Sequence, residues 1–358
     1  MIPTTRNKLI VLAGFACLFY FMSYRDRPDS STLEKYKKII NGFPTIPSCY
    51  LLPYDKGQLS DMSEYSVRPN TTFFLETSCR HDCGVSLGIR QSCAFESAAR
   101  AHPKTEILVL FPAPVSMRNP PPHVKMLLKF SNLKFFHVDV ERFFQGTPIK
   151  SIDFIEMMNK SAFAPSQASD ILRLTTLWKY GGTALDSDFV VLKSLHEKRN
   201  YIGQETKYSF STAALNIDIH TEIGKLVIEE MLKDVQANAD FAMKYGDQMG
   251  TALATRVLRK ICKVEHASDM TDEKCGGFHV LPASPESPLY PIGLEWEFFT
   301  RKNQDKKRFE KLKKDAWAVH MLGRESVRTS IKVGTDVFYE ALAAEFCPSV
   351  RSTVKDYF

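Results

Sequence analysis

Residues 165–195 read PSQASDILRLTTLWKYGGTALDSDFVVLKSL, and this stretch decides the fold class. Apolar side chains recur at helical spacing in its first half, and either Ser166 or Ser169 is a suitable N-cap. Gly181 offers the left-handed backbone at which many helices end. An apolar strand is predicted over 184–192. The stretch therefore predicts one helix followed directly by one strand.

Asp186 and Asp188 fall in the middle of that predicted strand. Alternate residues of a strand point to the same face, so we expect the two carboxylates to converge. Like charges this close repel unless a cation lies between them, and oxygen ligands suit Mg²⁺ or Mn²⁺. Such an ion commonly bridges to a diphosphate leaving group. A solvated turn would also contain Asp-x-Asp, but the apolar residues 189–192 place the pair at the mouth of a buried strand.

Asp170 and Arg173 lie one helical turn apart on one face of the predicted helix. Two interpretations stay open for this pair. It is either a surface ion pair of little energetic value, or a polar pair directed into the same crevice to grip a hydroxylated ligand.

Further strands and a helix are predicted on the N-terminal side of this stretch. Strands are expected over 72–76, 106–111 and 133–140, and a helix over 91–102. This alternation implies an α/β fold with a parallel sheet, in which nucleotides bind beyond the carboxyl ends of the strands. That rule places Thr77 and Ser78 near such a crevice, although these residues would equally serve to turn the chain.

The N-terminal residues 9–24, LIVLAGFACLFYFMSY, carry no charge. A cleaved signal peptide is disfavoured because no small-residue cleavage site follows, and a buried core helix is unusual at this place in a chain. We therefore expect an uncleaved signal anchor with a cytosolic tail over 1–8, in a thin Golgi-type bilayer. Residues 25–70 have the composition of a lumenal stem, which leaves 71–358 as the folded domain.

The composition is that of an ordinary globular protein, with 44% hydrophobic and 25% charged residues and a formal net charge of +6. These values exclude a disordered or collagen-like chain, and an anchored lumenal domain disfavours nucleic acid as a partner. There are eight cysteines, one of which, Cys17, lies in the apolar run. The others would mostly pair in a lumenal domain, with a connectivity that the sequence leaves open. The sequons at Asn70 and Asn159 agree with that compartment.

The stretch at 165–195 resembles the donor-site block of the α-1,4-glycosyltransferases. The block is carried by Ser169-Asp170-x-x-Arg173, Trp178-x-x-Gly181-Gly182 and Leu185-Asp186-x-Asp188-Phe189. Other motifs of the family follow the same order along the chain: Phe74-Leu75-Glu76-Thr77-Ser78, the helix over 93–103, Thr255-Arg256-Val257, Ala318-Val319-His320 and Cys347-Pro348. Several ordered motifs are far more specific than Asp-x-Asp alone, and the resemblance runs from about residue 72 onward.

The resemblance implies a single-pass type II Golgi membrane protein whose catalytic domain has a GT-A-like fold with a mostly parallel sheet. It implies transfer of a sugar from a UDP-sugar to a terminal galactose-type residue of a glycosphingolipid or related glycan. The sugar would be a hexose or N-acetylhexosamine of the galactose or N-acetylgalactosamine type. An α linkage made from an α-linked donor means retention of configuration.

The resemblance also implies roles for individual residues. Asp186 and Asp188 would act in catalysis by holding Mn²⁺ and the UDP diphosphate, with His320 as a third metal ligand. Asp170 and Arg173 would bind hydroxyls of the donor sugar, Thr77 would lie near the uridine, and Gly182 would belong to the donor site. A histidine satisfied within the fold is the alternative for His320.

Two departures from the family pattern affect the expected donor site. Thr183 and Ala184 replace an aromatic or β-branched pair after the double glycine. Residues 247–251, DQMGT, replace a Gly-His-(Gln/Asn)-Gly-Pro segment that is expected to line the donor or acceptor pocket. Because of the second change, one alternative function stays open. In this alternative the chain is a membrane-anchored, non-catalytic transferase homologue that acts as a binding or scaffolding partner.

Overall fold

The computed structural model describes residues 49–50, 59–81, 84–161, 163–242, 249–284, 287–291, 306–326 and 329–358. The predicted tail (1–8), anchor (9–24) and most of the stem lie outside these residues. None of the helices in the described ranges is long and apolar enough to cross a lipid bilayer.

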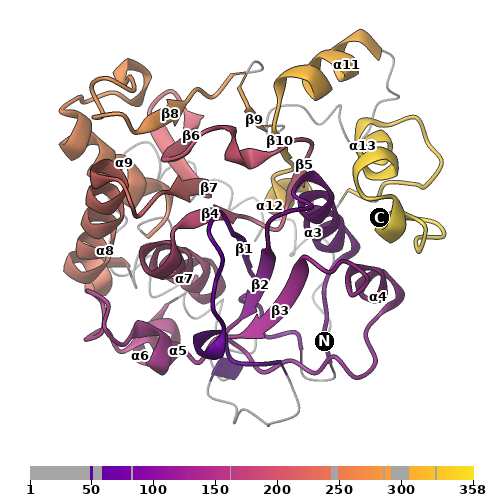
Figure 1. Cartoon of the computed structure of the whole chain (residues 1–358), viewed down its shortest axis with the longest axis horizontal. Coiled ribbons are helices and arrows are strands. Elements are labelled where there is room, and N and C mark those ends of the chain that lie inside the picture. The colour runs from indigo at the N-terminus through magenta and orange to yellow at the C-terminus, as the bar shows by residue number, and fades with distance from the viewer. Residues whose placement is uncertain are drawn as a thin grey trace, which may run out of the picture. The chain divides into compact units, whose positions relative to one another are not determined.

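Strands and helices alternate along the described chain (Figure 1). The strands are β1 (Thr72–Leu75), β2 (Ile107–Phe111), β3 (Leu133–His137), β4 (Gly182–Leu185), β5 (Phe189–Val191), β6 (Tyr201–Thr206), β7 (Ser209–Ile217), β8 (His279–Leu281), β9 (Leu289–Pro291) and β10 (Ala318–His320). The α-helices are α3 (Ile89–Ala101), α4 (Pro122–Leu127), α5 (Val140–Phe144), α6 (Phe154–Lys160), α7 (Ala164–Tyr180), α8 (Glu222–Ala242), α9 (Thr251–Cys262), α11 (Lys306–Asp315), α12 (Gly323–Ser326), α13 (Phe338–Phe346) and α14 (Pro348–Arg351). Short 3₁₀ turns are η2 (Met62–Glu64), η3 (Leu195–Glu197) and η4 (Ala267–Asp269).

Two sheets organise the fold. The larger has seven strands in the order β3-β2-β1-β4-β7-β6-β8, and the smaller has the order β5-β10-β9. Strands β1 to β4 run parallel to one another, β7 is antiparallel to both β4 and β6, and β8 is parallel to β6. The mixed, mostly parallel sheet confirms the α/β, GT-A-like arrangement expected from the sequence.

Helices cover both faces of the large sheet, with α7, α8 and α9 on one face and α3 and α4 on the other (Figure 1). Neighbouring residues of β1 show the division, because Phe73 is buried in the core beneath α7 and Phe74 in the core beneath α3. The ring of Phe74 lies 4.8 Å from that of Phe95 on α3. Parallel strands buried on both faces explain the continuous apolar runs of β1 and β2.

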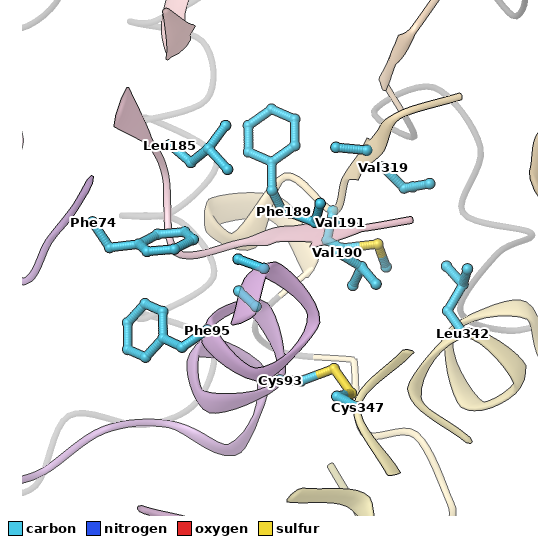
Figure 2. Close-up of a cluster of buried hydrophobic side chains, with 14 of the residues drawn as sticks. Phe74, Cys93, Phe95, Leu185, Phe189, Val190, Val191, Val319, Leu342 and Cys347 are labelled. Atoms are coloured by element: carbon cyan, nitrogen blue, oxygen red, sulfur yellow. A yellow bond between two sulfur atoms is a disulfide. The ribbon is translucent and has the colours of Figure 1, made fainter. Parts of the chain in front are cut away.

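Three disulfides connect six of the cysteines: Cys49–Cys79, Cys93–Cys347 and Cys262–Cys275. The second joins α3 to the start of α14 across a separation of 254 residues. Figure 2 shows this bridge beside the buried valines of β5 and Leu342 of α13. It therefore fastens the C-terminal helices to the core beneath α3.

The chain before β1 packs against the folded body, although its composition predicts a stem. Met62 is completely buried, the carbonyl of Ser60 accepts a hydrogen bond from the backbone of His137, and Cys49 is bonded to Cys79. The buried Met62 side chain and the Cys49–Cys79 disulfide hold this segment against the folded body, despite its polar composition.

The structure corrects the prediction of one strand over 184–192. The chain leaves the large sheet after Leu185, turns through residues 186–188, and enters the small sheet as β5. The turn is closed by a hydrogen bond of 3.3 Å from the Phe189 amide to the carbonyl of Asp186. β5 pairs with β10 rather than with a strand of the large sheet.

The start of α7 also differs from the expected N-caps. The helix begins at Ala164, before both Ser166 and Ser169, and no side chain caps it. Pro165 lies in the first turn, where its missing N–H leaves one fewer donor to satisfy. The expected end is confirmed, because Gly181 has a φ of +64° directly after Tyr180.

Candidate active site

A cavity of about 570 Å³ lies where β1 and β4 end and α3 begins. Thr77 and Ser78 line it beyond β1, Ser166 and Ser169 line it from α7, and residues 186–188 line it beyond β4. This is the position at which open α/β sheets bind ligands, at the carboxyl ends of adjacent parallel strands.

Asp186, Asp188 and His320 form a cluster at this cavity. One ligand atom from each residue lies within 4.8 Å of the other two. β10 places the histidine, because His320 is the partner of Phe189 in the antiparallel β5–β10 pair. The two rings stack, with centroids 4.3 Å apart and planes inclined by 10°. The carboxylates therefore converge as predicted, but through a turn between two sheets.

Asp188 is held from two sides. Its Oδ2 accepts a hydrogen bond of 2.6 Å from the amide of Gly323, and its Oδ1 lies 3.2 Å from Nε2 of His320. Oδ1 is buried and has no well-aligned hydrogen-bond donor among the described residues. Two carboxylates, one imidazole and a buried oxygen of this kind fit a divalent cation such as Mn²⁺.

The three groups shift one another's pKa. Burial raises the pKa of Asp186, Arg173 opposes this, and Asp188 adds to it, so the pKa ends above its usual range. Burial also opposes charge on Asp188 and on His320. Their mutual attraction outweighs it, so the pKa of the Asp188 carboxyl falls and that of the His320 imidazole rises. The cluster thus favours an ionised Asp188.

Arg173 belongs to α7, and its side chain connects this helix to Asp186 of the cluster. Its Nη1 donates to Oδ1 of Asp170 at 2.9 Å and to Oγ1 of Thr212 at 3.0 Å, and its Nη2 donates to Asp186 and to Ser169. The Arg173 side chain is only 3% exposed, so the surface ion-pair interpretation is wrong. The guanidinium fixes the orientation of the Asp186 carboxylate, and its expected contact with donor hydroxyls stays a prediction.

Asp170 is a largely buried carboxylate that pairs with Arg173 on the same helix. Burial raises its pKa to about 6, although Arg173 works against the rise. A β-carbon placed on Gly250 would lie 2.7 Å from its Oδ2, so glycine permits the close approach of α9. Of the segment 247–251, residues 249–251 are described, and none of these three is among the residues that line the cavity. The expectation that the segment lines the donor or acceptor pocket stays a prediction.

Thr77 and Gly182 differ in their relation to the cavity. Thr77 lines it, donates from Oγ1 to the carbonyl of Pro165 at 2.8 Å, and accepts at its own carbonyl from the Tyr50 hydroxyl at 2.5 Å. Gly182 lies at the opposite end of β4 from Asp186. A β-carbon there would lie 2.4 Å from the carbonyl oxygen of Thr71, so this glycine has a backbone role and the structure does not bring it to the cluster.

Four residues at the site escaped sequence reasoning. Gln91 and Ser187 hydrogen-bond to each other at the cavity, Glu76 accepts a hydrogen bond from Gln91, and Gly323 donates to Asp188. The position of Glu76 at the end of the strand predicted over 72–76 is the one signal that would have marked it. Gly323 and Gln91 carry no such signal, because tertiary packing brings them to the site.

Two parts of the chain match known families. Residues 88–209 match a family described as "Glycosyltransferase sugar-binding region containing DXD motif". Residues 220–354 match a family described as "Alpha 1,4-glycosyltransferase conserved region". The first region contains Asp186 and Asp188, and the second contains His320, so both parts of the cluster fall within matched sequence.

The comparisons also find individual relatives. Lactosylceramide 4-alpha-galactosyltransferase of Pan troglodytes is 28% identical over 324 residues, covering 85% of this chain and 87% of that protein. Alpha-1,4-N-acetylglucosaminyltransferase of Homo sapiens is 26% identical over 293 residues, covering 79% and 80%. A solved structure of galactosyltransferase LgtC in complex with donor and acceptor sugar analogues is 17% identical and covers 70% of this chain and 86% of that chain, with a TM-score of 0.35. The matched regions and the curated relatives therefore support the α-1,4-glycosyltransferase resemblance seen in the sequence.

Proposed function

We propose that this enzyme transfers a galactose- or N-acetylgalactosamine-type sugar from a UDP-sugar to a terminal galactose-type residue of a glycosphingolipid or related glycan. The observation that carries the proposal is the cluster of Asp186, Asp188 and His320 at the carboxyl ends of β1 and β4. One relative is named lactosylceramide 4-alpha-galactosyltransferase. This supports a galactose-type donor and a glycolipid acceptor.

The chemistry follows from what these side chains can do. Asp186, Asp188 and His320 would hold Mn²⁺, which neutralises the diphosphate of a departing UDP. Arg173 keeps the Asp186 carboxylate in place, and Thr77 lies where the uridine is expected. The anomeric carbon loses its bond to the UDP oxygen and gains one to the acceptor oxygen on the same face, and the hydroxyl proton leaves with UDP. We assign no protein nucleophile to this step.

We propose that residues 9–24 anchor the chain once in the Golgi membrane, in type II orientation, with the catalytic domain in the lumen. The three disulfides support this placement, since such bonds persist in oxidising compartments and are rare in the cytosol.

The test uses the full-length protein with Mn²⁺, a panel of UDP-hexoses and UDP-N-acetylhexosamines, and lactosylceramide or a β-N-acetylgalactosaminide as acceptor. Release of UDP identifies the donor, and NMR of the product identifies the linkage and its configuration. Asp188→Asn should abolish turnover while the fold is retained. Asp269→Asn, an exposed carboxylate outside the cavity, is the matched control and should leave turnover unchanged. Turnover by Asp188→Asn would refute the metal site, and a β-linked product would refute retention.

A further inference from the structure

Ser187 lies between the two clustered aspartates, in the turn that joins β4 to β5. Its Oγ accepts a hydrogen bond of 3.2 Å from Nε2 of Gln91. Gln91 is on the first turn of α3, and its Oε1 accepts a hydrogen bond of 2.8 Å from the amide of Gly88. One side chain thus connects the start of α3 to the middle of the Asp-x-Asp turn.

Glu76 fixes the other side of Gln91. This carboxylate follows β1 directly and is only 3% exposed. Its Oε2 accepts a hydrogen bond of 2.5 Å from Nε2 of Gln91, and its Oε1 accepts one of 2.9 Å from the amide of Ser78. The amide of Gln91 therefore has one consistent orientation, with its oxygen toward an N–H and its nitrogen toward two oxygens. Glu76, Gln91 and Ser187 all line the cavity.

We propose that Glu76, Gln91 and Ser187 form a relay that positions the Asp-x-Asp turn for the divalent cation. The three are positioning residues, because they act on the cation through Asp186 and Asp188. Residues that orient metal ligands in this way commonly contribute 10-fold to 100-fold to metal affinity. A charged acceptor in a buried place also makes the Gln91 hydrogen bond stronger than a neutral pair would. The inference rests on the metal site of the proposed function.

Direct binding of Mn²⁺ tests the relay. Isothermal titration of the full-length protein gives the dissociation constant for Mn²⁺ in the wild type, in Gln91→Met and in Ser187→Ala. Gln91→Met keeps the length of the side chain and removes its hydrogen bonds, and we expect binding that is about 10-fold to 100-fold weaker. Ser187→Ala removes a single hydroxyl and should weaken binding in the same direction. The double variant should bind no more weakly than Gln91→Met alone, because both changes break one relay.

Glu96→Gln is the matched control, since Glu96 is a fully buried carboxylate on the same helix. It accepts hydrogen bonds from the amides of Ser349 and Val350, and neither Glu96 nor these two residues line the cavity. This variant should lose thermal stability and keep the wild-type affinity for Mn²⁺. In steady-state kinetics, Gln91→Met should have a raised KM for Mn²⁺, and most of its kcat should be restored at saturating Mn²⁺.

Three outcomes would overturn the inference. Wild-type affinity in both single variants would refute the relay alone. Fully additive losses in the double variant would show that Gln91 and Ser187 act separately. A wild-type protein that does not bind Mn²⁺ would overturn the metal site of the proposed function and the relay with it. If Gln91→Met fails to fold, Ser187→Ala still decides the question, because it removes only one hydroxyl from the turn.

Discussion

Removal of the Cys93–Cys347 disulfide is expected to destabilise the protein more than removal of Cys262–Cys275. The first closes a separation of 254 residues and the second one of 13. Loop-closure entropy then assigns about 5.5 kcal/mol of unfolding free energy to the first bridge and about 3 kcal/mol to the second. The comparison is well matched, because all four cysteines are buried and alanine removes the same atoms at each pair.

The assay is urea denaturation of the wild type and the two double alanine variants under non-oxidising, non-reducing conditions. We expect the Cys93→Ala/Cys347→Ala variant to lose about 2.5 kcal/mol more than the Cys262→Ala/Cys275→Ala variant. Circular dichroism and tryptophan fluorescence report the transition independently. Equal losses, or a larger loss at Cys262–Cys275, would refute the argument from loop length.

Three further predictions concern the site and its surroundings. Arg173→Lys should weaken Mn²⁺ binding about 10-fold, because lysine keeps the charge but lacks the planar guanidinium that bonds to two carboxylates. Unchanged Mn²⁺ affinity in a calorimetric titration would contradict this. Gly250→Ala should lower kcat/KM for the donor and the melting temperature together, since the added methyl meets Asp170 Oδ2 at 2.7 Å; a variant with wild-type values in both assays would show that the close approach is dispensable. Burial lowers the pKa of His196 to about 4 in the folded protein, so the unfolded chain binds more protons as the pH falls from about 6.5 to about 4. Unfolding free energy should therefore decline across that window, and His196→Asn should flatten the decline measured by denaturant titration.

The local sequence pattern was sufficient to predict the helix and the strand that contribute most of their residues to the core. The helix predicted over 91–102 is Ile89–Ala101, and the strand predicted over 106–111 is Ile107–Phe111. The apolar residues of these two elements are buried in the core, so the periodicity and composition of the sequence predict the observed secondary structure. The convergence of Asp186 and Asp188 was also predicted, although from a strand geometry that is wrong.

Tertiary structure decided the rest of the site. An apolar run from residue 189 onward has the same appearance whether it continues β4 or enters a second sheet, and its partner β10 lies more than a hundred residues later. His320 was found through its place in a family motif, not through spacing. The amide of Gly323 reaches Asp188, and the side chain of Gln91 reaches Ser187, only because α12 and α3 pack there.

Because β5 pairs with β10, the proposed site can bind a metal ion only after the chain has been synthesised as far as β10. A nascent chain that has emerged up to residue 300 carries both aspartates but neither the imidazole ligand nor the strand that pairs with β5. The Cys93–Cys347 bridge forms later still. Arrested or prematurely terminated chains of that length are therefore expected to be unable to hold a metal ion or a nucleotide sugar at this site. Ribosome-arrested chains assayed for Mn²⁺ retention should show none, and retention before β10 emerges would contradict this reading of the fold.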